Sequence, residues 1–121
     1  MFKNIEKIFQ SLVWLNFFIS IIITIKIFIR NNYSFYEIST GLVITIIYAS
    51  VWFYALYKIY NFSKNGLRIY ISLTLLGFLF NILSNLSYLD KMIYLLTVTE
   101  HMIIGSIITF SYFSKIKSKF K

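Results

Sequence analysis

The sequence contains no cysteine, no proline, a single histidine and only four acidic residues among its 121 positions. Without cysteine, the chain cannot form disulfides, thiolate metal sites or iron–sulfur clusters, and it has no cysteine nucleophile. One histidine cannot supply both axial ligands of a bis-histidine haem within one chain, although a symmetric dimer could supply two. No cluster of ligand-type side chains indicates a metal centre, and no motif places a nucleophile beside the histidine. We therefore expect no cofactor, no metal and a non-enzymatic role.

Apolar residues, by contrast, are abundant. Hydrophobic residues make up 59% of the chain and charged residues 13%, whereas soluble domains carry about 25% charged residues. A helix needs about 20 apolar residues to cross a bilayer, and four stretches qualify, at approximately residues 8–29, 41–60, 68–88 and 92–113. The short connections favour antiparallel neighbours, and Asn65-Gly66 predicts the second turn. We predict an all-α fold in which residues 1–121 form one domain, an integral membrane bundle of four antiparallel transmembrane helices.

The basic residues divide unequally between the two ends of this predicted bundle. The end that holds both termini and the second connection has nine of them: Lys3, Lys7, Lys58, Lys64, Arg68, Lys115, Lys117, Lys119 and Lys121. The opposite end has Lys26, Arg30 and Lys91. Because cytoplasmic loops are enriched in Lys and Arg, both termini are predicted to be cytoplasmic in a cell inner (plasma) membrane. The orientation in the membrane thus explains the net positive charge of the chain. We expect the chain to interact with the lipid bilayer and not with nucleic acid.

The C-terminal tail, SKIKSKFK, interleaves lysines with Ile116 and Phe120. The candidate residues for binding lipid headgroups are Lys115, Lys117, Lys119 and Lys121. A basic residue near an anionic membrane surface contributes about 1 kcal/mol to such binding. An ordinary basic flank that stops translocation explains the same pattern more simply, so both interpretations stay open.

The last predicted span and the tail together end in IITFSYFSKIKSKFK, residues 107–121. In this segment an aromatic and serine-containing exit from the span leads into a short basic tail that ends near a phenylalanine. The segment resembles the C-terminus of small four-span bacterial inner-membrane proteins of unknown function. The resemblance implies a bacterial inner-membrane protein and no particular activity.

Each predicted span carries small or polar residues at spacings of three or four, which place them on one helix face. Such faces mediate helix contacts in membranes, because small residues allow close approach and polar residues form hydrogen bonds. The four stripes are Asn16, Ser20 and Thr24; Gly41, Thr45 and Ala49; Thr74, Gly77, Asn81 and Ser84; and Thr97, His101, Gly105 and Thr109. We expect all four to face inward in a compact bundle, although a homodimer could use one of them instead.

Glu100 and His101 stand near the centre of the fourth predicted span, within about 4 Å of the midplane at about 1.5 Å per residue. An unpaired carboxylate at that depth costs several kcal/mol, so Glu100 should be neutral or partnered. Adjacent helical residues point about 100° apart, which assigns His101 to the inward stripe and Glu100 to its flank. The other intramembrane polar candidates are Asn81, Tyr48 and Ser20 at similar depth, and Asn16 as an interhelical hydrogen-bonding residue.

Two functions fit these features. In the first, the chain is a multi-pass membrane protein that acts through helix association, as a homo-oligomer or as an accessory subunit of a membrane partner. In the second, it is a small proton-coupled transporter or channel in which Glu100 binds either a proton or a cationic substrate. A cavity beside Glu100 would favour the second function over the first.

Overall fold

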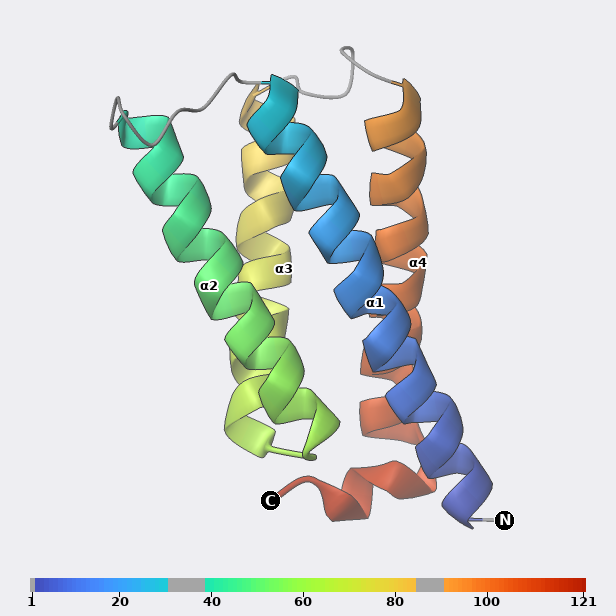
Figure 1. The fold of residues 1–121 in the computed structure, drawn as a ribbon. Coiled ribbons are helices and arrows are strands. Elements are labelled where there is room, and N and C mark those ends of the chain that lie inside the picture. Colours follow the sequence, from blue (N-terminus) through green and yellow to red (C-terminus); the bar gives the residue numbers. More distant parts are fainter. Residues whose placement is uncertain (1, 31–38, 85–90) are drawn as a thin grey trace.

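The computed structural model describes residues 2–30, 39–84 and 91–121, with only the backbone described at positions 2, 30 and 81–84 (Figure 1). Its elements are α1 (Phe2–Arg30), α2 (Thr40–Tyr60), α3 (Lys64–Ser84), α4 (Lys91–Phe113) and the 3-10 helix η2 (Lys115–Lys119). These described segments contain no strand. The all-helical prediction is therefore confirmed.

Three of the helices are long and apolar enough to cross a membrane, over Lys3–Ile29, Thr40–Tyr60 and Lys91–Phe113. The third expected span, residues 68–88, coincides with α3 as far as its end at Ser84, and the remainder lies outside the described residues. No proline interrupts these helices. Continuous helices suit an apolar medium, because all of their interior backbone groups are hydrogen-bonded within the segment.

The connection between α2 and α3 is a tight turn around Phe62, earlier than the predicted turn at Asn65-Gly66. Phe62 has a φ of 59°, the left-handed conformation that commonly ends a helix. Ser63 then caps α3, since its Oγ accepts a hydrogen bond from the Gly66 N–H over 3.3 Å. Gly66 thus lies inside α3, where a Cβ atom would stand only 3.2 Å from the carbonyl carbon of Lys58 in α2. Its small size serves helix contact and not the turn.

The four helices lie side by side, with both chain termini at one end of the bundle (Figure 1). α2 packs along α3, α1 packs along α4, and α1 also contacts α2. α3 and α4, by contrast, share few contacts among the described residues. After α4 the chain folds back, so that η2 packs against α4 and α1.

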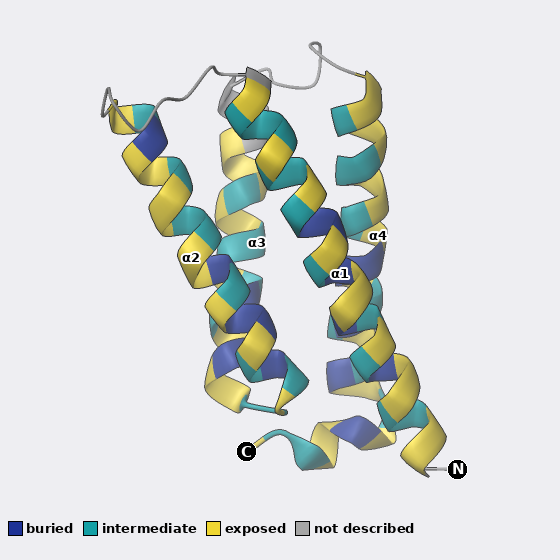
Figure 2. Ribbon diagram, viewed as in Figure 1, coloured by how far each residue is buried: buried dark blue, intermediate teal, exposed yellow. Residues whose placement is uncertain are grey.

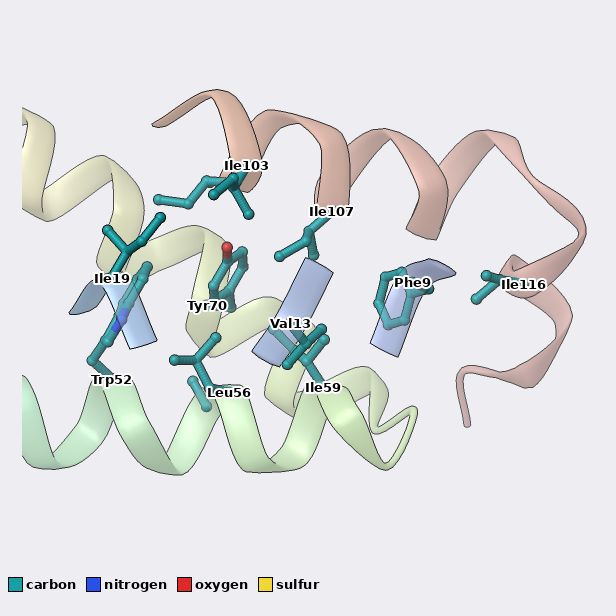
Figure 3. Packing of buried hydrophobic residues seen from close by; sticks show 12 residues of the cluster. Phe9, Val13, Ile19, Trp52, Leu56, Ile59, Tyr70, Ile103, Ile107 and Ile116 are labelled. Carbon is teal, nitrogen blue, oxygen red and sulfur yellow. The ribbon is translucent and has the colours of Figure 1, made fainter. Parts of the chain in front are cut away.

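The buried core gathers toward the end of the bundle that holds the termini (Figures 2 and 3). It consists of Phe9, Val13, Ile19, Trp52, Ala55, Leu56, Ile59, Tyr70, Ile103, Ile104, Ile107 and Ile116. Large apolar side chains also cover the outside, among them Ile29 and Met102, each 70% exposed, and Phe113, 86% exposed. A bundle that is apolar both inside and outside is compatible with a membrane protein, because lipid solvates an apolar surface that water does not.

Candidate functional site

A network of polar side chains links α1, α2 and α3 in the interior of the bundle. Asn16 and Ser20 lie one turn apart on α1 and are both buried. The Ser20 Oγ accepts a hydrogen bond from Trp52 Nε1 of α2 over 2.8 Å, and Asn16 Nδ2 donates to the Tyr70 hydroxyl of α3. The Ser20 Oγ lies 3.1 Å from Asn16 Oδ1, which joins the two contacts into one chain of hydrogen bonds.

Glu100 adds α4 to this network. Its Oε2 lies 3.5 Å from the Ser20 Oγ, a long distance for a hydrogen bond between two oxygens. The Ser20 hydroxyl can donate only one hydrogen bond, and Asn16 Oδ1, at 3.1 Å, is a nearer acceptor than the Glu100 carboxylate. A protonated Glu100 could instead donate its own proton to Ser20. Ser20 is therefore a better hydrogen-bond partner for a protonated Glu100 than for an ionised one.

Trp52 and Tyr70 were missed by the sequence analysis. Trp52 is 5% exposed and Tyr70 is fully buried, and their rings stack with centroids 4.9 Å apart and an interplanar angle of 24°. A signal was present in the sequence, because an indole N–H or a phenol hydroxyl inside an apolar span usually finds a polar partner when buried. The buried side-chain nitrogen and oxygen atoms of the described residues all have hydrogen-bond partners.

The orientation of α4 differs from the prediction. Its buried residues are Ile103, Ile104, Ile107 and Ser111, and Glu100 precedes them at helical spacing on the same side. Gly105 and Thr109 are exposed, and nothing lies within 4 Å of the position of a Cβ on Gly105. The expectation that all four stripes face inward is therefore wrong for Gly105 and Thr109 of α4, whereas Thr97 and His101 of the same stripe are half-buried. Ile103, Ile104 and Ile107 belong to the buried core on this side of α4, while Thr109 satisfies its own hydroxyl by donating to the Gly105 carbonyl over 2.8 Å.

His101 is half-buried and is held mainly by its own helix. Its Nδ1 lies 2.7 Å from the Thr97 carbonyl oxygen, so Nδ1 carries the proton in this contact. Its ring meets Phe78 of α3 edge to face, with centroids 6.5 Å apart. His101 thus bridges α3 and α4 by ring packing, and it is not part of the network around Ser20.

Tyr48 ties α2 to α3 at a separate point. Its hydroxyl donates to the Leu73 carbonyl over 2.7 Å, and its ring stacks on Trp52 at 6.4 Å with an interplanar angle of 9°. The hydroxyl lies directly over Gly77, where a Cβ would stand 3.5 Å from Tyr48 Cζ and still closer to the oxygen. Asn81 belongs to α3, but its side chain lies outside the described residues.

The predicted stripe on α2 is half-buried over its whole length, at Gly41, Thr45 and Ala49. Thr45 donates its hydroxyl proton to the Gly41 carbonyl over 2.8 Å. Such a bond within one turn satisfies a hydroxyl without any neighbouring helix. These small residues are half-buried but, within the described part of the chain, form no side-chain hydrogen bond to another helix. The interhelical side-chain hydrogen bonds of α2 come from Trp52 and Tyr48.

A shallow hollow of about 610 Å³ lies on the outer side of α4. The residues that line it are Met102, Gly105, Ser106, Thr109, Phe110, Phe113 and Ser114. It contains the two exposed residues of the α4 stripe and does not include Glu100. Among the described residues, no group of three histidine or acidic side chains is placed to hold a metal ion.

The tail lysines occupy different surroundings. Lys115, Lys117 and Lys121 are exposed, whereas Lys119 forms an ion pair with Glu6 of α1.

Comparison with protein-family models, with curated proteins and with solved structures finds no match for this chain.

Proposed function

We propose that the chain is an integral membrane protein with four membrane-spanning helices and cytoplasmic termini. Support comes from the three apolar helices described above and from the large apolar side chains on their outer surfaces. The excess of basic residues at the end that holds both termini supports the orientation. Tags on both termini should be accessible to an impermeant reagent from the cytoplasmic side only, and access from the other side would contradict this orientation.

We further propose that the protein acts through helix association, as a homo-oligomer or as an accessory subunit. The observation that carries this proposal is the outward position of Gly105 and Thr109 in the hollow on α4. The Cβ position of Gly105 is free of contacts, so the backbone of a partner helix could approach closely there, as it does at small-residue contacts in membranes. The inward polar groups, in contrast, are already engaged within the chain.

The test is a pair of substitutions on the outer side of α4. Gly105→Leu fills the hollow, whereas Val98→Leu enlarges a side chain that is already 42% exposed on the same helix. Energy transfer between labelled copies in liposomes, or between the chain and a co-purified partner, should fall in Gly105→Leu and persist in Val98→Leu. Equal association in both variants, with equal helical content, would place the interface elsewhere.

A second function, proton-coupled transport or conduction, has one observation in its favour. Glu100 is an acid on the inner side of the bundle, and its contact there is with the neutral Ser20 and not with a cationic side chain. Such intramembrane acids are common at proton-binding sites. Reconstituted chain should then show a proton-driven flux that Glu100→Gln abolishes and Glu6→Gln retains. Absence of flux in the wild-type chain would leave helix association as the function.

A further inference from the structure

We propose that residues 114–121, the C-terminal clasp, form a folded binding surface for the headgroups of anionic phospholipids. The inference rests on the membrane placement proposed above and is independent of how the helices associate. It differs from the simple picture of a basic tail, because here the binding depends on the folded position of the clasp as well as on its charge.

The apolar residues of the clasp face the protein. Ile116 is fully buried. The Phe120 ring meets Phe9 of α1 edge to face at 5.8 Å and Phe62 of the α2–α3 turn at 5.6 Å. An amphipathic segment that binds a membrane by insertion needs its apolar side chains in the lipid. In the clasp these side chains pack against the protein, so the exposed lysines Lys115, Lys117 and Lys121 are the residues that can meet the membrane surface.

Backbone contacts hold the clasp in one position. The Lys64 N–H donates to the Lys121 carbonyl over 3.1 Å, and the Lys121 N–H donates to the Phe62 carbonyl over 3.3 Å. At the other end of the clasp, Ser114 Oγ accepts from the Ile116 N–H over 3.2 Å. The clasp is thus tied to the α2–α3 turn by a reciprocal pair of hydrogen bonds and is capped where it leaves α4.

Docking of the clasp gathers positive charge from three parts of the chain. The backbone hydrogen bond places Lys121 beside Lys64 of α3. The ion pair between Lys119 and Glu6 holds the clasp against α1, whose first turns carry further lysines. Glu6 is the only acidic residue in the segments that form this end, and Lys119 engages it. The exposed basic residues of these segments are Lys3, Lys7, Lys64, Arg68, Lys115, Lys117 and Lys121.

The position of the clasp favours lipid headgroups over a soluble anion. Tyr112 and Phe113 immediately precede it and are 42% and 86% exposed. Tyr57, near the end of α2, is 65% exposed. Exposed aromatic residues at the ends of spans lie at the level of the headgroups. The lysines that follow Phe113 therefore emerge where phosphate groups of the bilayer are concentrated.

The experiment measures binding of phosphatidylglycerol and phosphatidylcholine to the full-length chain in detergent, by native mass spectrometry at low salt. The wild-type chain should prefer phosphatidylglycerol. Replacing two lysines, in Lys115→Gln/Lys117→Gln, should weaken that binding about tenfold or more, while Lys91→Gln at the opposite end should not change it. Phe120→Ala keeps every charge but undocks the clasp, and it should weaken binding several-fold, whereas Phe120→Leu should restore it.

Three results would overturn the proposal. They are a wild-type chain without preference for phosphatidylglycerol, undiminished binding in Phe120→Ala, and displacement of the lipid by millimolar inorganic phosphate. The second would show an unstructured basic tail, and the third a site for a soluble anion. Extraction of the wild-type chain from membranes by alkaline carbonate tests the membrane placement separately, since a chain released by carbonate would refute the proposed function itself.

Discussion

Trp52 of α2 donates its indole N–H to the hydroxyl of Ser20 on α1 over 2.8 Å, and both side chains are buried. Lipid offers little hydrophobic force to bring helices together, so contacts of this kind help to decide which faces meet. Ser20 is also the residue that Glu100 approaches from α4. One small hydroxyl thus connects three helices, and its removal is the most direct test of the interior network.

Ser20→Ala should lower the free energy of unfolding by about 1–3 kcal/mol, because it leaves the buried Trp52 N–H without an acceptor. The matched control is Ser11→Ala on the same helix, which loses only an exposed bond to the Lys7 carbonyl. Reversible unfolding by SDS in mixed micelles measures both. Equal stability of the two variants would mean that the Trp52 contact is not formed in the membrane.

Gly77→Ala should destabilise the chain by about 1 kcal/mol, because the new methyl group displaces the Tyr48 hydroxyl from its bond to the Leu73 carbonyl. Combination with Tyr48→Phe, which removes that oxygen, should cost little more than Tyr48→Phe alone, a non-additivity expected for touching residues. Gly105→Ala, where no neighbour of the same chain lies within 4 Å, is the control, with all variants measured as diluted monomers. Strictly additive effects in the double variant would contradict the contact.

Gly66→Ala should cost more than Gly77→Ala, about 1–3 kcal/mol. Its methyl group would overlap the Lys58 Cβ and stand 3.2 Å from the Lys58 carbonyl carbon and 3.3 Å from the Ile59 nitrogen, and none of these atoms can swing aside as the end of a side chain can. Asn65→Ala, an exposed position in the same turn of α3, should be nearly neutral. The same SDS titration compares them, and a neutral Gly66→Ala would show that α2 and α3 are less closely packed at this end.

Asn16 and Tyr70 should be energetically coupled through their buried hydrogen bond. Tyr70→Phe leaves the Asn16 amide without its acceptor, and Asn16→Leu leaves the Tyr70 hydroxyl without its donor, so each should cost about 1–3 kcal/mol. The double variant should be more stable than the sum of the two predicts, because neither the Asn16 amide nor the Tyr70 hydroxyl is then left buried without its partner. A double-mutant cycle gives the coupling directly, and a value near zero would argue against the bond.

The two tryptophans should respond differently to the bilayer. Trp14 is 49% exposed on the outer side of α1, whereas Trp52 is 5% exposed. In liposomes that contain brominated lipid, bromine quenches tryptophans that contact the lipid. The Trp52→Phe variant, which retains only Trp14, should be strongly quenched, whereas the Trp14→Phe variant, which retains only Trp52, should be quenched weakly. Strong quenching in both variants would mean that α2 turns its Trp52 side toward lipid. Absence of quenching in both would contradict membrane insertion.

Depth along a helix could be estimated from the sequence, whereas rotation about the helix axis could not be estimated reliably. Counting residues placed Ser20 and Glu100 in one layer, and the structure brings their oxygens to 3.5 Å. The same counting could not show which side of α4 faces α1. The small and polar stripe indicated His101 and Gly105, but the isoleucines form the buried side and bring Glu100 inward with them.

Composition and spacing along one chain are enough to predict the helical class, the position of the apolar segments and the unequal charge of the two ends. How each helix turns about its axis and where the tail docks depend on contacts between distant segments, and these are visible only in the folded structure. A threonine or serine can satisfy its hydroxyl on its own helix, so a polar stripe does not reveal a contact face. The burial of Ile116 and Phe120 and the ion pair of Lys119 with Glu6 depend on residues that are distant in sequence, and no local pattern encodes them.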